Sequence, residues 1–181
     1  DTIGTPVILL THSQGGGVGF DVAERRPNLV HGIVTVEPGG PQMGGANTAT
    51  VEPGNRNRNS WGLTTNPFRF EPAITSPSEL NVQLEEKSDR PDEVRCWMQV
   101  EPVRKLVNFE KIPVLAISGN GTYHRVFDHC IPKWLNQAGG KAEFVRLEDV
   151  GISGNGHMMM LERNSDDIIK FIHGWIGEHL K

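Results

Sequence analysis

The chain of 181 residues has no long apolar run and no concentration of positive charge. No stretch approaches the roughly 18 consecutive apolar residues that a membrane-spanning helix needs. Lys and Arg number 18 against 22 Asp and Glu, and they are scattered along the sequence. This distribution argues against nucleic acid or an anionic membrane surface as the main partner. The composition, 36% hydrophobic and 22% charged, is that of an ordinary globular protein.

The chain has only two cysteines, Cys96 and Cys130, and their number does not decide in which cellular compartment the protein lies. One disulfide between them fits an exported protein, either secreted or periplasmic. Two free buried thiols fit equally well, so a cytoplasmic location stays open. Pairs of His and Cys at the spacing of metal ligands are also lacking. We therefore expect no metal and no cofactor.

Predicted strands and helices alternate at both ends of the chain, which is the pattern of a parallel sheet with helices on both faces. Strands are expected at residues 7–11, 31–36, 112–118 and 143–147, and helices at 14–26 and 127–138. A final amphipathic helix begins near Ser165, its predicted N-cap, with Asp166 and Asp167 in the first turn. The ends of the chain therefore predict an α/β fold.

The middle of the chain breaks this alternation. Residues 38–88 carry many Gly, Pro, Asn and Ser together with scattered aromatics. A helix is expected within residues 92–108. We interpret the chain as two parts of one core, residues 1–40 and 109–181, separated by a lid or cap at residues 41–108.

Residues 7–20, VILLTHSQGGGVGF, run from an apolar strand through a serine flanked by glycines into a helix. Such a sharp turn lifts the Ser13 hydroxyl clear of the sheet, as in a nucleophile elbow. The backbone N–H of Gln14, at the helix N-terminus, can then point at a developing oxyanion. Thr11 stands where the motif G-x-S-x-G has its first glycine. The alternative, a phosphate-binding loop, lacks the lysine of G-x-x-x-x-G-K-[ST].

A serine nucleophile needs a base, and the base needs an acid that orients it. His157 lies in the Gly-rich segment GISGNGHMMM, between the last predicted strand and the last helix. An ordinary loop histidine is the alternative. Glu37 ends the strand after the nucleophile helix, at the carboxyl edge of the sheet where sites gather. It could instead bind only loop amides, and three other carboxylates are weaker candidates: Asp128, Glu148 and Asp149.

Apolar and aromatic residues predict a substrate pocket beside these groups. The predicted pocket residues are His12, Trp61, Phe68 and Met158. His12, next to the nucleophile, is expected to be a packing or hydrogen-bonding neighbour rather than the base. The run Met158, Met159 and Met160 could equally fill the core.

Three segments, THSQGG, VTVEPGG and GISGNGHMMMLERNSD, together resemble the α/β-hydrolase esterases typified by a bacterial periplasmic esterase of unusual topology and by similar fungal proteins. The resemblance implies an α/β-hydrolase fold with Ser13 as nucleophile, Glu37 as acid and His157 as base. It also implies a small carboxylic ester or lactone as the substrate.

Complete members of this fold carry several strands before the nucleophile strand, and a loop of one of them donates the second oxyanion N–H. None precedes Val7 here. We therefore expect a fragment, or a processed chain whose sheet a companion chain completes. The leading function is ester hydrolysis through an acyl-serine. An acyltransferase or lyase on the same fold and a non-catalytic ligand-binding or interaction module are the alternatives.

Overall fold

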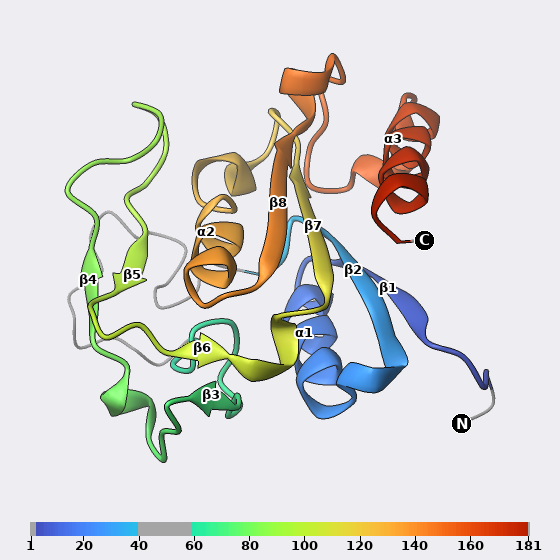
Figure 1. Ribbon diagram of the computed structural model, residues 1–181. Helices are drawn as coiled ribbons and strands as arrows, with labels where there is room; N and C mark the ends of the chain where they lie inside the picture. Colours follow the sequence, from blue (N-terminus) through green and yellow to red (C-terminus); the bar gives the residue numbers. More distant parts are fainter. Residues whose placement is uncertain (1–2, 40–58, 181) are drawn as a thin grey trace.

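The computed structural model describes residues 3–39 and 59–180 of the chain. Parallel strands form its central four-stranded sheet, in the order β1-β2-β7-β8 (Figure 1). Their bounds are β1 Val7–His12, β2 Val30–Val36, β7 Pro113–Ser118 and β8 Lys141–Arg146. These strands confirm the predicted α/β fold, with boundaries that differ by up to two residues.

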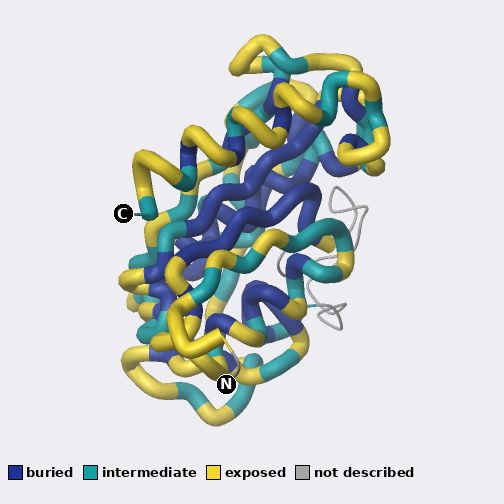
Figure 2. Tube along the Cα trace, turned by 90° about the vertical axis from the view of Figure 1, so that its right-hand side faces the viewer, coloured by how far each residue is buried: buried dark blue, intermediate teal, exposed yellow. Residues whose placement is uncertain are grey.

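Helices cover both faces of this sheet. Their bounds are α1 Gly15–Arg25, α2 Cys130–Gln137 and α3 Ser165–His179. On β2, Ile33 packs into the core shared with α1 and α2, whereas its neighbour Val34 packs into the core shared with α3. Successive side chains of a strand point to opposite faces, so α3 lies opposite the other two helices. The middle strands are accordingly buried along most of their length (Figure 2).

Strand β1 lies at an edge of the sheet in the described part of the chain and pairs there with β2 alone. Its side chains Ile8 and Leu10 are 38% and 60% exposed. An edge strand presents unpaired backbone groups, and exposed apolar side chains on it favour further pairing. This edge is therefore a surface on which more polypeptide can add.

The predicted helix within residues 92–108 is wrong. Instead, β5 (Trp97–Gln99) pairs antiparallel with β4 (Val82–Leu84), and β6 (Lys105–Leu106) pairs antiparallel with β3 (Phe70–Glu71). A proline in a helix interior removes a hydrogen bond and clashes with the preceding turn, and Pro102 lies in the middle of this segment. The Gln99 side chain binds both the N–H and the C=O of Arg104 at 3.0 Å, which fixes a turn there.

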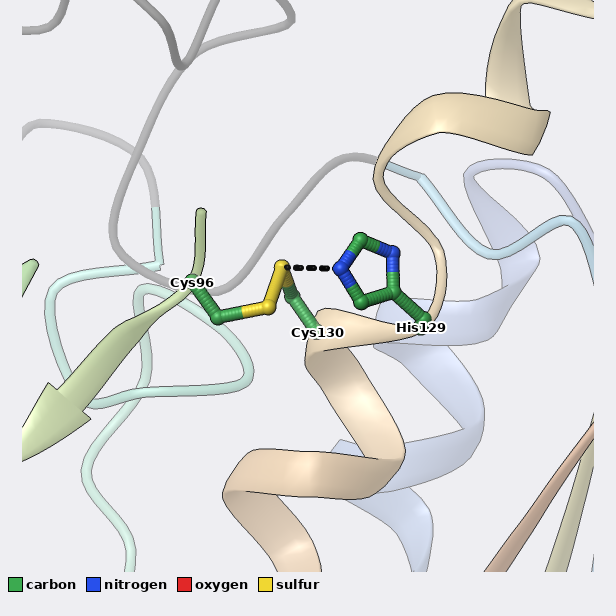
Figure 3. A group of neighbouring side chains, drawn as sticks. All are labelled: Cys96, His129 and Cys130. Atoms are coloured by element: carbon green, nitrogen blue, oxygen red, sulfur yellow. Dashed lines mark hydrogen bonds between the residues drawn. A yellow bond between two sulfur atoms is a disulfide. The ribbon is translucent and has the colours of Figure 1, made fainter. Parts of the chain in front are cut away.

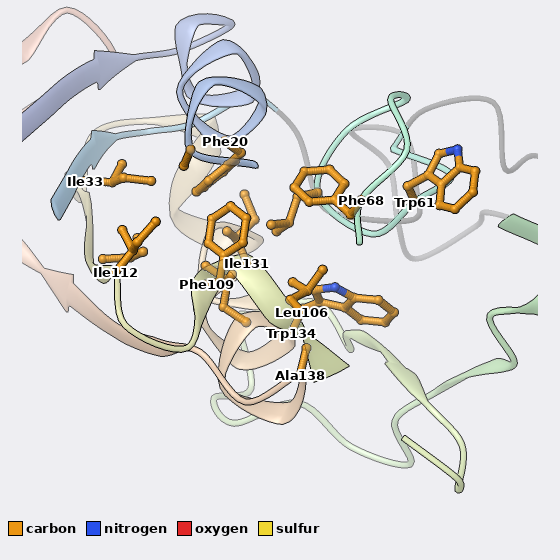
Figure 4. Close-up of a cluster of buried hydrophobic side chains, with 14 of the residues drawn as sticks. Phe20, Ile33, Trp61, Phe68, Leu106, Phe109, Ile112, Ile131, Trp134 and Ala138 are labelled. Atoms are coloured by element: carbon orange, nitrogen blue, oxygen red, sulfur yellow. The ribbon is translucent and has the colours of Figure 1, made fainter. Parts of the chain in front are cut away.

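The first part of the predicted lid, residues 41–58, lies outside the described residues. The remainder, residues 59–108, contributes to the main core. Trp61 and Phe68 are buried in one cluster with Phe109 and Trp134, as Figure 4 shows. Both side chains thus pack in the main core, and neither is among the residues that line the cavity beside His12.

Of the two alternatives for the cysteines, a disulfide or two free thiols, the structure contains the disulfide. Cys96 and Cys130 are bonded across a sequence separation of 34 residues (Figure 3). Cys96 directly precedes β5, and Cys130 is the first residue of α2. The bond therefore ties the segment 59–108 covalently to a helix of the sheet domain.

Two predicted helix starts shift. A 3-10 turn at Tyr123–Val126 precedes α2, which begins at Cys130 rather than at residue 127. Asn164, not Ser165, is the N-cap of α3, whereas Asp166 and Asp167 do lie in its first turn. The Asn164 side chain makes no capping bond because it is paired with the side chain of Asn155.

Candidate active site

Ser13 occupies the turn between β1 and α1 with a positive φ of 53°. Its backbone N–H donates to Val36 at 3.0 Å, and its carbonyl accepts from Gly16 at 2.9 Å and from Gly39 at 2.7 Å. Left-handed backbone is uncommon for a residue with a side chain and persists where the surroundings hold it. This is the sharp strand-to-helix turn expected of a nucleophile elbow.

Glycines on α1 let the strand and the helix approach closely. A Cβ on Gly16 would lie 2.5 Å from Cβ of Pro38, and one on Gly19 would lie 2.7 Å from Cγ2 of Thr11. Thr11 replaces the first glycine of the motif, so Gly19 supplies the space that the threonine methyl needs. The Thr11 hydroxyl donates to the hydroxyl of Thr35 at 2.9 Å.

Glu37 follows directly after β2, also with a positive φ, and its side chain is fully buried. One carboxylate oxygen accepts from the backbone N–H of Gly119 at 2.9 Å. The other accepts from the Thr122 hydroxyl at 3.0 Å and from Nδ1 of His157 at 2.7 Å. A buried carboxylate requires such partners, and here they also fix where it points.

His157 lies between Glu37 and Ser13. Its Nε2 is 3.0 Å from the Ser13 hydroxyl oxygen. Because the Glu37 carboxylate accepts from Nδ1, the neutral ring carries its proton on Nδ1 and leaves Nε2 free to accept from the serine. The three residues predicted from separate motifs thus form one hydrogen-bonded row, in a geometry that can transfer the serine proton to the imidazole.

The loop that carries His157 is held by residues that the sequence analysis missed. Asn155 is fully buried, and its amide donates to Glu162 at 2.5 Å and to Asn164 at 2.7 Å. Glu162 also accepts from the backbone N–H of Gly156 at 2.8 Å. The polar residues that flank His157 in the segment GNGHMMMLERN are the signal that could have indicated them. They fix the loop immediately before the histidine.

The other carboxylates considered as the acid contact different partners. Asp128 binds His124 rather than His157, at 2.9 Å. Glu148 pairs with Arg125 at 3.3 Å. Asp149 pairs with Arg90. Among the four candidates, Glu37 alone is bonded to His157 in the described residues.

The remaining predicted site residues surround the row. His12 contacts the ring of His157, with centroids 4.6 Å apart, and its Nε2 donates to the His157 carbonyl at 2.8 Å. Gln14 is the N-cap of α1, where backbone N–H groups lack helical acceptors. Met158 is half exposed beside His157.

An apolar cavity of about 420 Å³ opens near these residues. It lies between the ends of β1 and β2 and the first turns of α3, and His12 is part of its wall. Its main apolar lining residues are Leu10, Val36, Met159, Met160, Ile168 and Ile172. A cavity with this lining can bind an apolar part of a ligand or an apolar polypeptide segment.

Three groups of side chains in the described residues bring possible metal ligands within 4.8 Å of one another. In one group, Cys96 and Cys130 are already joined as a disulfide. In the second, the carboxylates pair with Lys133 and Arg146. The third combines His124 with Glu37 and His157, whose ligand atoms are already bonded to one another. Each group thus contains side chains that already take part in a disulfide, an ion pair or a hydrogen bond.

The model of the Alpha/beta hydrolase family matches residues 1–171. The chain belongs to this family. A probable secreted lipase, phiG, of a fungal species (strain ATCC 74256) is 36% identical to this α/β hydrolase over 177 residues. The match covers 97% of this chain and 47% of the lipase, so the chain spans about half the length of that relative.

Solved structures show the same fold. A novel bacterial esterase superposes with a TM-score of 0.56 at 23% identity, over 97% of this α/β hydrolase and 39% of the esterase. The monoacylglycerol lipase of Paleococcus ferrophilus superposes with a TM-score of 0.50 at 15% identity, over 98% of this chain and 70% of the lipase. Among the helices of residues 3–39 and 59–180, none combines the length and apolar character needed to cross a membrane.

Proposed function

We propose that this α/β hydrolase cleaves a carboxylic ester or lactone through an acyl-serine intermediate, with Ser13 as nucleophile, His157 as base and Glu37 as acid. The continuous row of hydrogen bonds from Glu37 through His157 to Ser13 is the observation that carries the proposal. Each link has the length and the polarity that proton transfer from the serine requires.

The reaction follows from this row. The Ser13 oxygen attacks the ester carbonyl carbon while Nε2 of His157 takes the hydroxyl proton. The buried carboxylate of Glu37 stabilises the imidazolium that forms. His157 then gives the proton to the leaving alcohol oxygen as the bond from carbonyl carbon to alcohol breaks. Water, activated in the same way, hydrolyses the acyl-serine and releases the acid.

The backbone N–H of Gln14 is proposed to bind the oxyanion of the tetrahedral intermediate, because it belongs to the N-terminal turn of α1. A second donor is proposed to come from polypeptide that pairs with the free edge of β1, either on the same chain or on a companion chain. The exposed side chains Ile8 and Leu10 support this proposal, as does the greater length of the fungal relative. One missing oxyanion donor typically costs about 10²- to 10³-fold in kcat.

The substrate is proposed to be a small ester or lactone with an apolar part. The apolar cavity beside His12 and the lipase name of the relative support this class. Export from the cell is proposed as well. The disulfide between Cys96 and Cys130 and the word secreted in the name of the same relative support it.

Steady-state hydrolysis of p-nitrophenyl butyrate by the full-length protein tests the proposal. Ser13→Ala and His157→Ala are each expected to reduce kcat by at least about 10³-fold, with unchanged thermal unfolding. Hydrolysis by Ser13→Ala at the wild-type rate contradicts the proposal and favours a binding module or another nucleophile.

A further inference from the structure

The imidazole of His157 is stacked on the imidazole of His124, a residue that the proposed reaction does not use. The two ring centroids are 4.6 Å apart, and the planes differ by 2°. The side chain of Tyr123 also contacts both rings, with centroid distances of 4.4 Å to His124 and 5.5 Å to His157. Stacking at this separation is favourable and depends on ring orientation.

His124 is itself firmly held. It is buried, and its Nδ1 is 2.9 Å from a carboxylate oxygen of Asp128, which is fully buried. Its backbone N–H donates to the hydroxyl of Thr122, and the same hydroxyl donates to Glu37. A single segment, residues 119–128, therefore holds the acid on one side and the stacked ring on the other.

His124 is neutral at neutral pH. Burial, and then the neighbouring His157 and His12, lower the pKa of His124 to about 4. Burial, and then the charge of Glu37, raise the pKa of Asp128 well above its usual range. A neutral His124 ring does not repel the positive charge that forms on His157 during catalysis. A protonated His124 would destabilise that charge.

We propose that His124, fixed by Asp128, is a positioning residue: its ring holds the His157 imidazole in the plane that joins Glu37 to Ser13. The inference rests on the proposed function, because a ring rotated out of this plane matters only if His157 carries the proton. In this role His124 exchanges no proton with the substrate and acts through His157.

Two matched double variants of the full-length protein test this role. Both remove the buried polar pair, and replacement of both partners by apolar groups of similar shape is far better tolerated than removal of one. His124→Phe/Asp128→Leu, the phenylalanine pair, keeps an aromatic ring against His157. His124→Leu/Asp128→Leu, the leucine pair, places an aliphatic side chain there instead. The difference between the two variants therefore isolates the stacked ring.

The measured quantities are kcat and KM for p-nitrophenyl butyrate and the rate at which a fluorophosphonate labels Ser13. We expect the leucine pair to lower kcat and the labelling rate by about 10- to 100-fold, with KM within about twofold. We expect the phenylalanine pair to stay within about threefold of wild type. Equal losses in both variants, or no loss in either, overturn the inference.

Ring nitrogen NMR of His157 separates this inference from the proposed function, because it needs no turnover. We expect wild type and the phenylalanine pair to show one tautomer, protonated at Nδ1, and the leucine pair to show a mixture. An unchanged tautomer in the leucine pair overturns the positioning role. A wild-type protein whose Ser13 takes no label contradicts the proposed function instead, whatever the tautomer result.

Discussion

Ser13 and Glu37 follow directly after two neighbouring parallel strands, and both have a left-handed backbone, with φ of 53° and 45°. The N–H of Ser13 binds the carbonyl of Val36, the residue before Glu37. The two turns therefore share one hydrogen-bonding register, which presents a hydroxyl and a carboxylate at the same edge of the sheet. His157 needs only to lie between them.

Glu37→Gln is expected to lower kcat by about 10³- to 10⁴-fold. The neutral amide no longer stabilises the imidazolium, and its NH₂ group can turn toward Nδ1 and favour the wrong tautomer of His157. Steady-state kinetics with p-nitrophenyl butyrate measures the loss. Glu110→Gln, which changes an exposed carboxylate, serves as the control. An activity of Glu37→Gln within tenfold of wild type would refute the role of the carboxylate.

Gly19→Ala is expected to destabilise the fold by about 1 to 3 kcal/mol, because the new methyl group overlaps Cγ2 of Thr11. Thr11→Ala removes that Cγ2, so the double variant should unfold at a higher urea concentration than the sum of the single effects predicts. Urea unfolding of the four proteins gives the coupling. Additivity within about 0.5 kcal/mol would mean that the two residues do not compete for this space.

Cys96→Ser/Cys130→Ser is expected to reduce the free energy of unfolding by about 3 to 4 kcal/mol, since the bond closes a loop across a separation of 34 residues. Urea unfolding without reductant measures this change. Dithiothreitol should weaken the wild type to a similar extent and leave the double variant unchanged. Equal midpoints for wild type and the double variant contradict a stabilising role of the bond.

Asp128→Asn should give the protein a new loss of stability as the pH falls from about 6.5 to about 4. In this range the unfolded chain protonates His124 while the folded chain does not, so folding releases a proton and low pH destabilises. In the wild type, Asp128 takes up a proton on folding and compensates, because its pKa is raised. The difference in unfolding free energy between the two proteins, followed against pH, measures the effect.

The difference should grow in favour of the wild type as the pH falls, by at most about 1.4 kcal/mol per pH unit, the value for one proton. Glu110→Gln, at an exposed carboxylate, provides the control for the loss of one acidic group. A pH-independent difference between Asp128→Asn and wild type would show that the two buried groups do not compensate each other.

The sequence analysis located the four strands of the central sheet, the three helices that cover it and the three residues of the row, because each of these three residues ends an element or lies in a short Gly-rich segment beside one. It failed where contacts join distant segments. Thr122 and Glu37 are 85 residues apart, and nothing local to Thr122 indicates its partner. The same holds for the stacking of His124 on His157.

Residues 92–108 show a different limit. Val100, Val103 and Leu106 have a spacing compatible with a helix, yet the segment forms short antiparallel pairs. Packing of Leu106 into the core and the fixed turn at Arg104 override the local pattern. Trp61 and Phe68 show the same limit, because only the packed structure shows that these aromatics belong to the main core cluster.

The central claim is that Ser13 is an activated nucleophile, and intact-mass analysis of the full-length protein after fluorophosphonate treatment tests it most directly. We predict one adduct per catalytic unit, located on the Ser13 peptide and absent from Ser13→Ala, with strongly slowed labelling of His157→Ala. The measurement is made under denaturing conditions, which also separate any companion chain. A folded wild-type protein that takes no label, or takes it on another residue, would contradict the claim.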